Sequence, residues 1–171
     1  MAYDVIQMLP IGSTSSSSAL AGVLGIEQEV LSTKLPGVTA SLVPPGSITR
    51  IKLVKASGAI SAAQNVALLW TTDASTGTVG AVTGAAAVTG TVAGIAILPS
   101  ANATSGDYFW VAIRGPVLAT TAGAVAAGAP LATHSTAGAL DDTTVTYATV
   151  VARAMAAIGS ATTGVVYAQC A

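Results

Sequence analysis

Apolar and polar residues alternate at short intervals along most of this chain, and the pattern predicts strands. In "SITRIKLVKA", residues 47–56, the even-numbered positions fall on one face of an extended segment and the odd-numbered positions fall on the other. Each face mixes apolar with cationic side chains, as on a partly solvated sheet. "NVALLW", residues 65–70, is a continuous apolar run that predicts a buried strand, and "TTDASTGTVG" supplies turn-forming residues after it.

The clearest predicted strand is "YFWVAIRG", residues 108–115, in which Phe109, Val111 and Ile113 alternate with the residues between them. It holds three of the chain's aromatic residues, which number seven in all (two Trp, four Tyr and one Phe). We therefore expect it to anchor the core. Gly115-Pro116 is expected to end it, because proline cannot donate a hydrogen bond within a sheet.

The Ala- and Gly-rich stretch "RGPVLATTAGAVAAGAPLATHSTAGALDD", residues 114–142, predicts short strands joined by tight turns. Gly123, Gly128 and Gly138 fall among short apolar segments, where glycine allows positive φ and close approach of a neighbouring strand. Further strands are expected in "TTVTYATVVARAM" and "GVVYAQCA". A short helical element in "VVARAMAAIG" stays open as an alternative.

The N-terminal residues predict an extended arm. An apolar segment, "AYDVIQMLPIG", is followed by "GSTSSSS", which is typical of a flexible linker. The residues around Glu27 and Glu29 allow a helical turn or two, but Gly22 and Gly25 disfavour a long helix. We therefore expect this region to be mostly extended.

The composition changes the picture of the core. Of the 171 residues, 52% are hydrophobic, but only 4% are aromatic and 8% are charged, against about 25% charged residues in an ordinary soluble domain. Much of the hydrophobic fraction is alanine. Burying a Leu or Ile side chain contributes about 1.5–3 kcal/mol, whereas a methyl group contributes about 0.8 kcal/mol. An alanine-rich core is thus thin per residue, and we expect association with other subunits to add stability.

Charge and hydropathy exclude two classes of partner. The net charge is −1, and the densest basic group is only Arg50, Lys52 and Lys55, so no positive stripe is present to neutralise nucleic-acid phosphates. Residues 74–106 carry no formal charge, but Thr and Gly interrupt them, which fits short strands better than a lipid-facing helix. No cationic and apolar signal peptide is evident at the N-terminus. We expect neither nucleic-acid nor membrane binding.

The side chains needed for catalysis or metal binding are scarce. His134 is the single histidine, and it is expected to be a solvated loop residue rather than an acid or base. Asp141 and Asp142 adjoin each other, and neighbouring strand residues point to opposite faces, so we expect them to begin a turn rather than to hold a cation. Cys170 is the single cysteine and cannot form an internal disulfide. No phosphate-binding loop is present. We predict no catalytic residue, cofactor or metal site.

Several segments together resemble small structural proteins of tailed bacteriophages. These are "MAYDVIQMLPIG", "GVLGIEQEV", "RIKLVKASG", "DYFWVAIRGP", "AGAVAAGAPLATHSTAGAL" and "YATVVARAMAAIGSATTGVVYAQ". From about residue 107 onward the chain is similar to the β-rich capsid decoration, or cement, proteins. In that family a strand ending in Gly-Pro leads into a Gly-rich turn ending in Pro-Leu, a variable loop, a "V-x-R-A-M/L" segment and a closing strand. The matching positions here are Gly115-Pro116, Gly123 to Leu131, Val151 to Met155 and Val165 to Tyr167.

The resemblance implies an all-β fold: a small β-barrel-like or β-tulip-like domain that forms homotrimers on the exterior of the capsid in the virion. Its extended arm would clamp adjacent subunits of the major capsid protein and so stabilise the assembled shell. The residues expected to make this contact are the apolar residues of the arm: Tyr3, Val5, Ile6, Met8, Leu9 and Ile11.

The chain departs from the simplest members of that family by an extra region. We therefore expect three parts: an extended arm with a Ser-rich linker over 1–35, an additional β-rich module over 36–107 and a C-terminal β-barrel-like domain over 108–171. The main alternative function is a phage tail, fibre or host-surface-binding module. A major capsid protein is disfavoured because the chain is short and has no evident long helix, and an enzyme ranks last.

Overall fold

The computed structural model describes residues 9–60, 65–72, 79–84, 92–98, 103–136, 138–142 and 150–170. Its strands are β1 (Glu27–Leu31), β2 (Ile48–Ala56), β3 (Ala67–Thr72), β4 (Val79–Gly84), β5 (Val92–Ala96), β6 (Tyr108–Thr120), β7 (Pro130–Thr133), β8 (Leu140–Asp141), β9 (Ala152–Ala154) and β10 (Thr163–Gln169). Two 3-10 turns, η1 (Ser18–Val23) and η2 (Ser32–Lys34), flank β1. No helix in these ranges has the length and hydropathy of a membrane-spanning segment.

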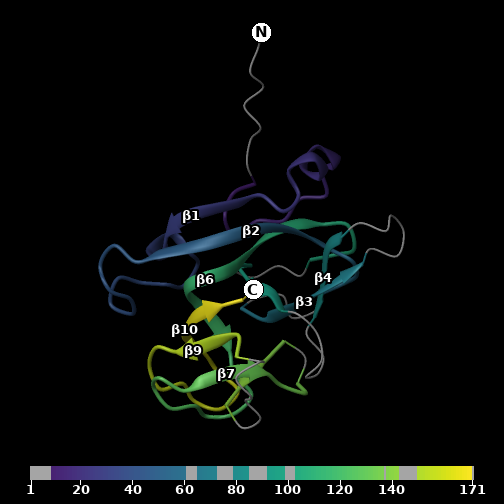
Figure 1. The fold of residues 1–171 in the computed structure, drawn as a ribbon. Helices are drawn as coiled ribbons and strands as arrows, with labels where there is room; N and C mark the ends of the chain where they lie inside the picture. The colour runs from purple at the N-terminus through teal and green to yellow at the C-terminus, as the bar shows by residue number, and fades with distance from the viewer. Residues whose placement is uncertain are drawn as a thin grey trace.

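The strands form one sheet in the order β1-β2-β4-β3-β5-β6-β10-β9-β7-β8, with an additional pairing of β2 with β6. Apart from the parallel pair β2 and β4, the pairings between these strands are antiparallel. In Figure 1, β1 to β4 form the upper part of the molecule, and β7 and β9 form the lower part. The long strand β6 joins the two parts.

The all-β prediction is confirmed, but the sheet as a whole is not closed into a barrel, although the β2–β6 pairing joins β2, β4, β3, β5 and β6 into a ring within it. In the part of the chain that the structure describes, the sheet order ends at β1 and at β8. β1 lies at the top of the view in Figure 1, whereas β7, the partner of β8, lies at the bottom. The two terminal strands are therefore too far apart to pair, and closure of the whole sheet would require that pairing.

Strand formation agrees with most of the sequence pattern. In β2 the residues from Ile48 to Leu53 alternate between exposed or half-buried and buried positions, and β3 carries the buried run expected from "NVALLW". The segment around Glu27 and Glu29 is a strand, not a helical turn. "VVARAMAAIG" likewise contains strand β9, so the helical alternative is wrong. Burial of an alternating face, rather than local helix propensity, decides both segments.

The predicted domain boundary between residues 107 and 108 falls immediately before β6. This strand pairs with β2 and β5, which precede the boundary, and with β10, which follows it. The sheet is therefore continuous across the boundary. The division into 1–35, 36–107 and 108–171 stays a prediction about separate folding.

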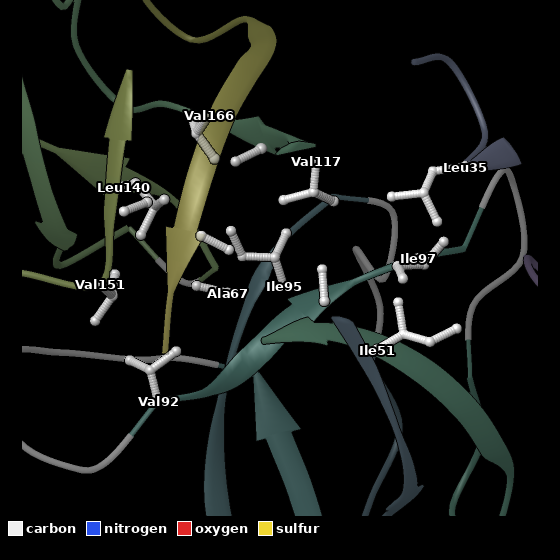
Figure 2. Close-up of a cluster of buried hydrophobic side chains, with 14 of the residues drawn as sticks. Leu35, Ile51, Ala67, Val92, Ile95, Ile97, Val117, Leu140, Val151 and Val166 are labelled. Carbon is white, nitrogen blue, oxygen red and sulfur yellow. The ribbon is translucent and has the colours of Figure 1, made fainter. Parts of the chain in front are cut away.

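Buried side chains form two clusters on opposite sides of β6. Trp110 and Phe109 are neighbours in sequence, and each is almost fully buried, Trp110 in the larger cluster and Phe109 in the smaller one. In Figure 2, side chains of the larger cluster converge from several strands, with Ile51, Ile95, Val117 and Val166 among them. As expected from its sequence, "YFWVAIRG" anchors the core.

The prediction that Gly115-Pro116 ends this strand is wrong, because β6 continues to Thr120. Gly115 has φ of +106°, and a Cβ there would collide with the carbonyl oxygen of Ile48 and lie 2.9 Å from Thr49 Cα. The pairing with β2 ends at Arg114, so the missing N–H of Pro116 leaves no gap in that ladder. Instead, the Pro116 carbonyl accepts a hydrogen bond from Thr49 Oγ1 at 2.7 Å. Glycine thus lets one strand bend and continue.

Replacing Gly115 with alanine should destabilise the fold by roughly 3 kcal/mol, because the left-handed backbone strain adds to a collision with β2. Gly106 is the matched control: its φ is +94°, but no atom lies within 4 Å of a Cβ built there. Gly106→Ala should therefore cost only about 1 kcal/mol. Urea unfolding of both variants measures the difference, and equal losses would contradict the crowding at Gly115.

Candidate binding surface

The predicted contact residues of the arm fall into two groups. Tyr3, Val5, Ile6 and Met8 lie outside the described residues. Leu9 is buried in the core of its own chain, and Ile11 packs partly buried against that core. The contact of these six residues with a capsid stays a prediction.

The first described residues are held firmly to β6. The indole Nε1 of Trp110 donates a buried hydrogen bond of 2.7 Å to the carbonyl oxygen of Leu9. Ser15 exchanges two backbone hydrogen bonds with Tyr108, of 3.0 and 2.7 Å. Any segment that precedes Leu9 is therefore attached at a fixed point on the longest strand.

His134 belongs to the turn between β7 and β8. Its Nδ1 accepts a hydrogen bond from the Thr136 amide at 3.0 Å, and its Nε2 lies 3.7 Å from Asp141 Oδ2. Asp141 is buried, and its Oδ1 accepts a hydrogen bond from the Asp142 amide. These contacts hold the turn in shape. Within the described ranges, no three His, Cys, Asp or Glu side chains come together as metal ligands.

Cys170 lies just after β10, partly buried against the larger core cluster. Burial raises the pKa of its thiol from 9.0 to about 12, because the thiolate would lose its hydration. A hydrogen bond with the Gln169 backbone opposes this shift of the pKa more weakly. The thiol is therefore protonated at neutral pH and a poor nucleophile.

A hollowed surface crosses four strands on the outer side of the sheet. We call it the arginine groove, and it comprises Glu29 of β1, Ile48 and Arg50 of β2, Arg114 of β6, Tyr167 and Gln169 of β10, and Cys170 just after β10. It consists of two adjoining hollows of about 280 Å³ each, which share Arg114 and Tyr167. Strand register explains the assembly, because Glu29 pairs with Arg50, Arg50 with Arg114, and Arg114 with Gln169.

Among the described residues, the cationic side chain of the groove on β2 is paired with carboxylates on β1, but the one on β6 is not. Arg50 lies 3.3 Å from Glu29, and on the same face Lys52 lies 3.1 Å from Glu27. Lys52 also sits 5.5 Å above the ring of Trp70. Arg114 is exposed and, within the described part of the chain, has no carboxylate at ion-pair distance. The groove therefore presents one unneutralised guanidinium.

Exposed apolar side chains border the groove. Ile48 is 52% exposed and Leu31 is 49% exposed, and the two residues are opposite each other in the β1–β2 pairing. No local sequence pattern indicates this surface, because Arg50 and Arg114 are far apart in the chain and meet only through the β2–β6 pairing. Only the group of Arg50, Lys52 and Lys55 was visible in the sequence.

Together, the all-β sheet and its exposed groove of mixed polarity define a β-sheet module. The structure is similar to the crystal structure of the N base of the head fiber gp8.5 in bacteriophage phi29. The match has a TM-score of 0.52 at 13% sequence identity, and it covers 69% of this chain and 92% of the other. At this identity the likeness shows a shared fold. No protein-family model matches the sequence, and no curated protein matches it.

Replacing Trp110 with phenylalanine should loosen the N-terminal attachment. The Leu9 carbonyl would lose its buried donor, which costs about 1–3 kcal/mol, and amide hydrogen exchange at Ser15 and Tyr108 should accelerate. Trp70→Phe serves as a control, because Trp70 is half-buried and lies outside this attachment. Unchanged exchange in the Trp110 variant would contradict the role of the hydrogen bond.

Cys170 borders the arginine groove but is partly buried, and it should react with a thiol reagent at pH 8 much more slowly in the folded protein than after unfolding. In the folded protein very little thiolate is present at this pH, because burial raises the pKa of the thiol to about 12. Labelling kinetics with and without guanidinium measure this difference, and rapid labelling of the folded protein would refute burial of the thiol.

The same thiol should make the stability of the protein depend on pH. Because the unfolded chain releases the thiol proton near pH 9 and the folded chain retains it, the free energy of unfolding should fall as the pH rises from 9 towards 12.

Proposed function

We propose that the protein is a structural, non-enzymatic component of a bacteriophage virion, located on the outer surface of the head. The observation that carries this proposal is the shared fold with a head fiber base, since the match takes in 92% of that base. The resemblance of the C-terminal part of the sequence to capsid decoration proteins supports it independently. Low charge and many small side chains also suit a surface that packs against other subunits.

In this proposal the protein binds the major capsid protein as a homotrimer and bridges adjacent subunits. Binding to the assembled shell, but not to its separated subunits, stabilises assembly by mass action. At a concentration of free protein one hundred times the Kd, each site contributes about 2.7 kcal/mol. Repeated over many sites, this opposes rupture of the shell.

The leading residues, Tyr3, Val5, Ile6 and Met8, are proposed as the clamp that reaches a neighbouring subunit. Leu9 supplies a fixed origin through its hydrogen bond with Trp110. Eight residues in extended form span at most about 28 Å. In the proposal this reach carries the clamp to a neighbouring subunit, and Leu9 and Ile11 form the root of the clamp.

A second candidate is the anchoring base of a fibre. The specific observation in its favour is that the similar structure is itself described as the base of a head fiber. The two candidates share attachment to the head and differ in what projects from it. Electron micrographs of decorated heads distinguish them, because the base of a fibre would carry a fibre that projects from the head.

Deletion of residues 1–8 should abolish attachment to heads while leaving the fold intact, because Leu9 and its bond to Trp110 are retained. A second variant keeps the length of the arm but replaces Tyr3, Val5, Ile6 and Met8 with serine. Both variants should remain in the supernatant when undecorated heads of the encoding phage are sedimented, whereas the full chain should pellet. Pelleting of either variant at the level of the full chain would refute the clamp, and circular dichroism controls for folding.

A further inference from the structure

We propose that the arginine groove binds an acidic, extended segment of the shell protein, with the Arg114 guanidinium as the principal contact. This inference rests on the proposed attachment to a phage head and assigns a surface to it. It concerns the outer face of the sheet and is independent of the leading residues.

The first argument is the placement of two like charges. Arg50 and Arg114 are directly opposite each other in the β2–β6 pairing, an arrangement that destabilises a sheet when it is not compensated. Glu29 compensates Arg50 at 3.3 Å. Arg114 has no such partner in the described part of the chain, so an incoming carboxylate would relieve the repulsion. A guanidinium also binds carboxylates through two parallel hydrogen bonds, which fixes their orientation.

The second argument is the shape of the surface beside Arg114. The two hollows of about 280 Å³ meet at Arg114 and Tyr167, so the space continues across β2, β6 and β10. Tyr167 offers an aromatic face, Ile48 an exposed apolar side chain, and Gln169 an amide that can donate and accept hydrogen bonds. An extended segment that alternates acidic and apolar residues matches this lining.

The third argument is the scarcity of charge in this protein. The chain has only six Lys and Arg residues among 171, and Arg50, Lys52 and Arg114 lie on this one face. Because the net charge is −1, the protein as a whole does not attract acidic partners. The attraction is therefore local to the groove, and it should weaken as salt screens the exposed charges.

The decisive variant is Arg114→Glu, assayed by sedimentation with undecorated heads of the encoding phage. Arg114 is exposed, so the substitution should preserve the fold, which thermal unfolding checks. We expect binding at least about tenfold weaker, as for the loss of a charged hydrogen-bonded contact. The matched control is Lys34→Glu, which makes the same change of charge at an exposed site in η2, outside the groove. The control should bind as the unchanged chain does.

The outcomes separate the two proposals. If the unchanged chain pellets with heads and Arg114→Glu pellets equally well, or if Lys34→Glu loses as much binding, the groove proposal is wrong while head attachment stands. If the unchanged chain does not pellet, head attachment is wrong. If Arg114→Glu instead breaks up an oligomer, measured by light scattering without heads, the groove belongs to a contact between copies and the shell assignment is overturned.

A peptide probe tests the chemistry of the groove without heads. A hexaglutamate peptide should shift the NMR signals of Arg114, Tyr167 and Gln169 at low salt, and a hexaglutamine peptide should not. The shifts should disappear in Arg114→Gln and persist in Lys34→Gln. Equal shifts with both peptides, or with Arg114→Gln, would overturn an acidic partner.

Discussion

The bend of β6 at Gly115 is the constraint on which the fold depends. Up to Arg114 the strand pairs with β2 and β5, and from Arg114 onward it pairs with β10. A Cβ at this position would collide with β2, so the close approach of the two strands requires glycine. The Thr49 hydroxyl, bonded to the Pro116 carbonyl and to Ser32 Oγ, satisfies the buried polar groups at the bend. Gly115 thus allows β6 to pair with strands of both the upper and the lower part of the sheet.

The same strand compensates for a core made largely of small side chains. Trp110 and Phe109 place aromatic volume on both sides of β6, and Val111 and Ala112 bury their side chains between them and the bend. Alanine and glycine elsewhere let the remaining strands pack closely around this centre. Because each methyl group contributes little on burial, much of the stability is concentrated in β6 and its partners.

Periodicity predicted the all-β class and the strands in 47–56, 65–70 and 108–115, because the pattern of apolar residues is a local property. Periodicity wrongly predicted that the strand ends at Gly115-Pro116. The strand continues through Pro116 because its pairing with β2 has already ended at Arg114. Periodicity also could not show whether the sheet closes into a barrel, because closure depends on pairing between strands that are distant in sequence. The arginine groove was invisible for the same reason: Arg50 and Arg114 become neighbours only through register. Local patterns thus reveal strands, whereas surfaces require the topology.

The hydrogen bond from Trp110 to Leu9 has a mechanical consequence. It couples the start of the chain to the strand with the most extensive pairing in the described sheet. Tension applied to the leading residues therefore enters the molecule at β6, where neighbouring strands on both edges share it, instead of peeling away a peripheral strand. A tether rooted in this way transmits force to the whole sheet.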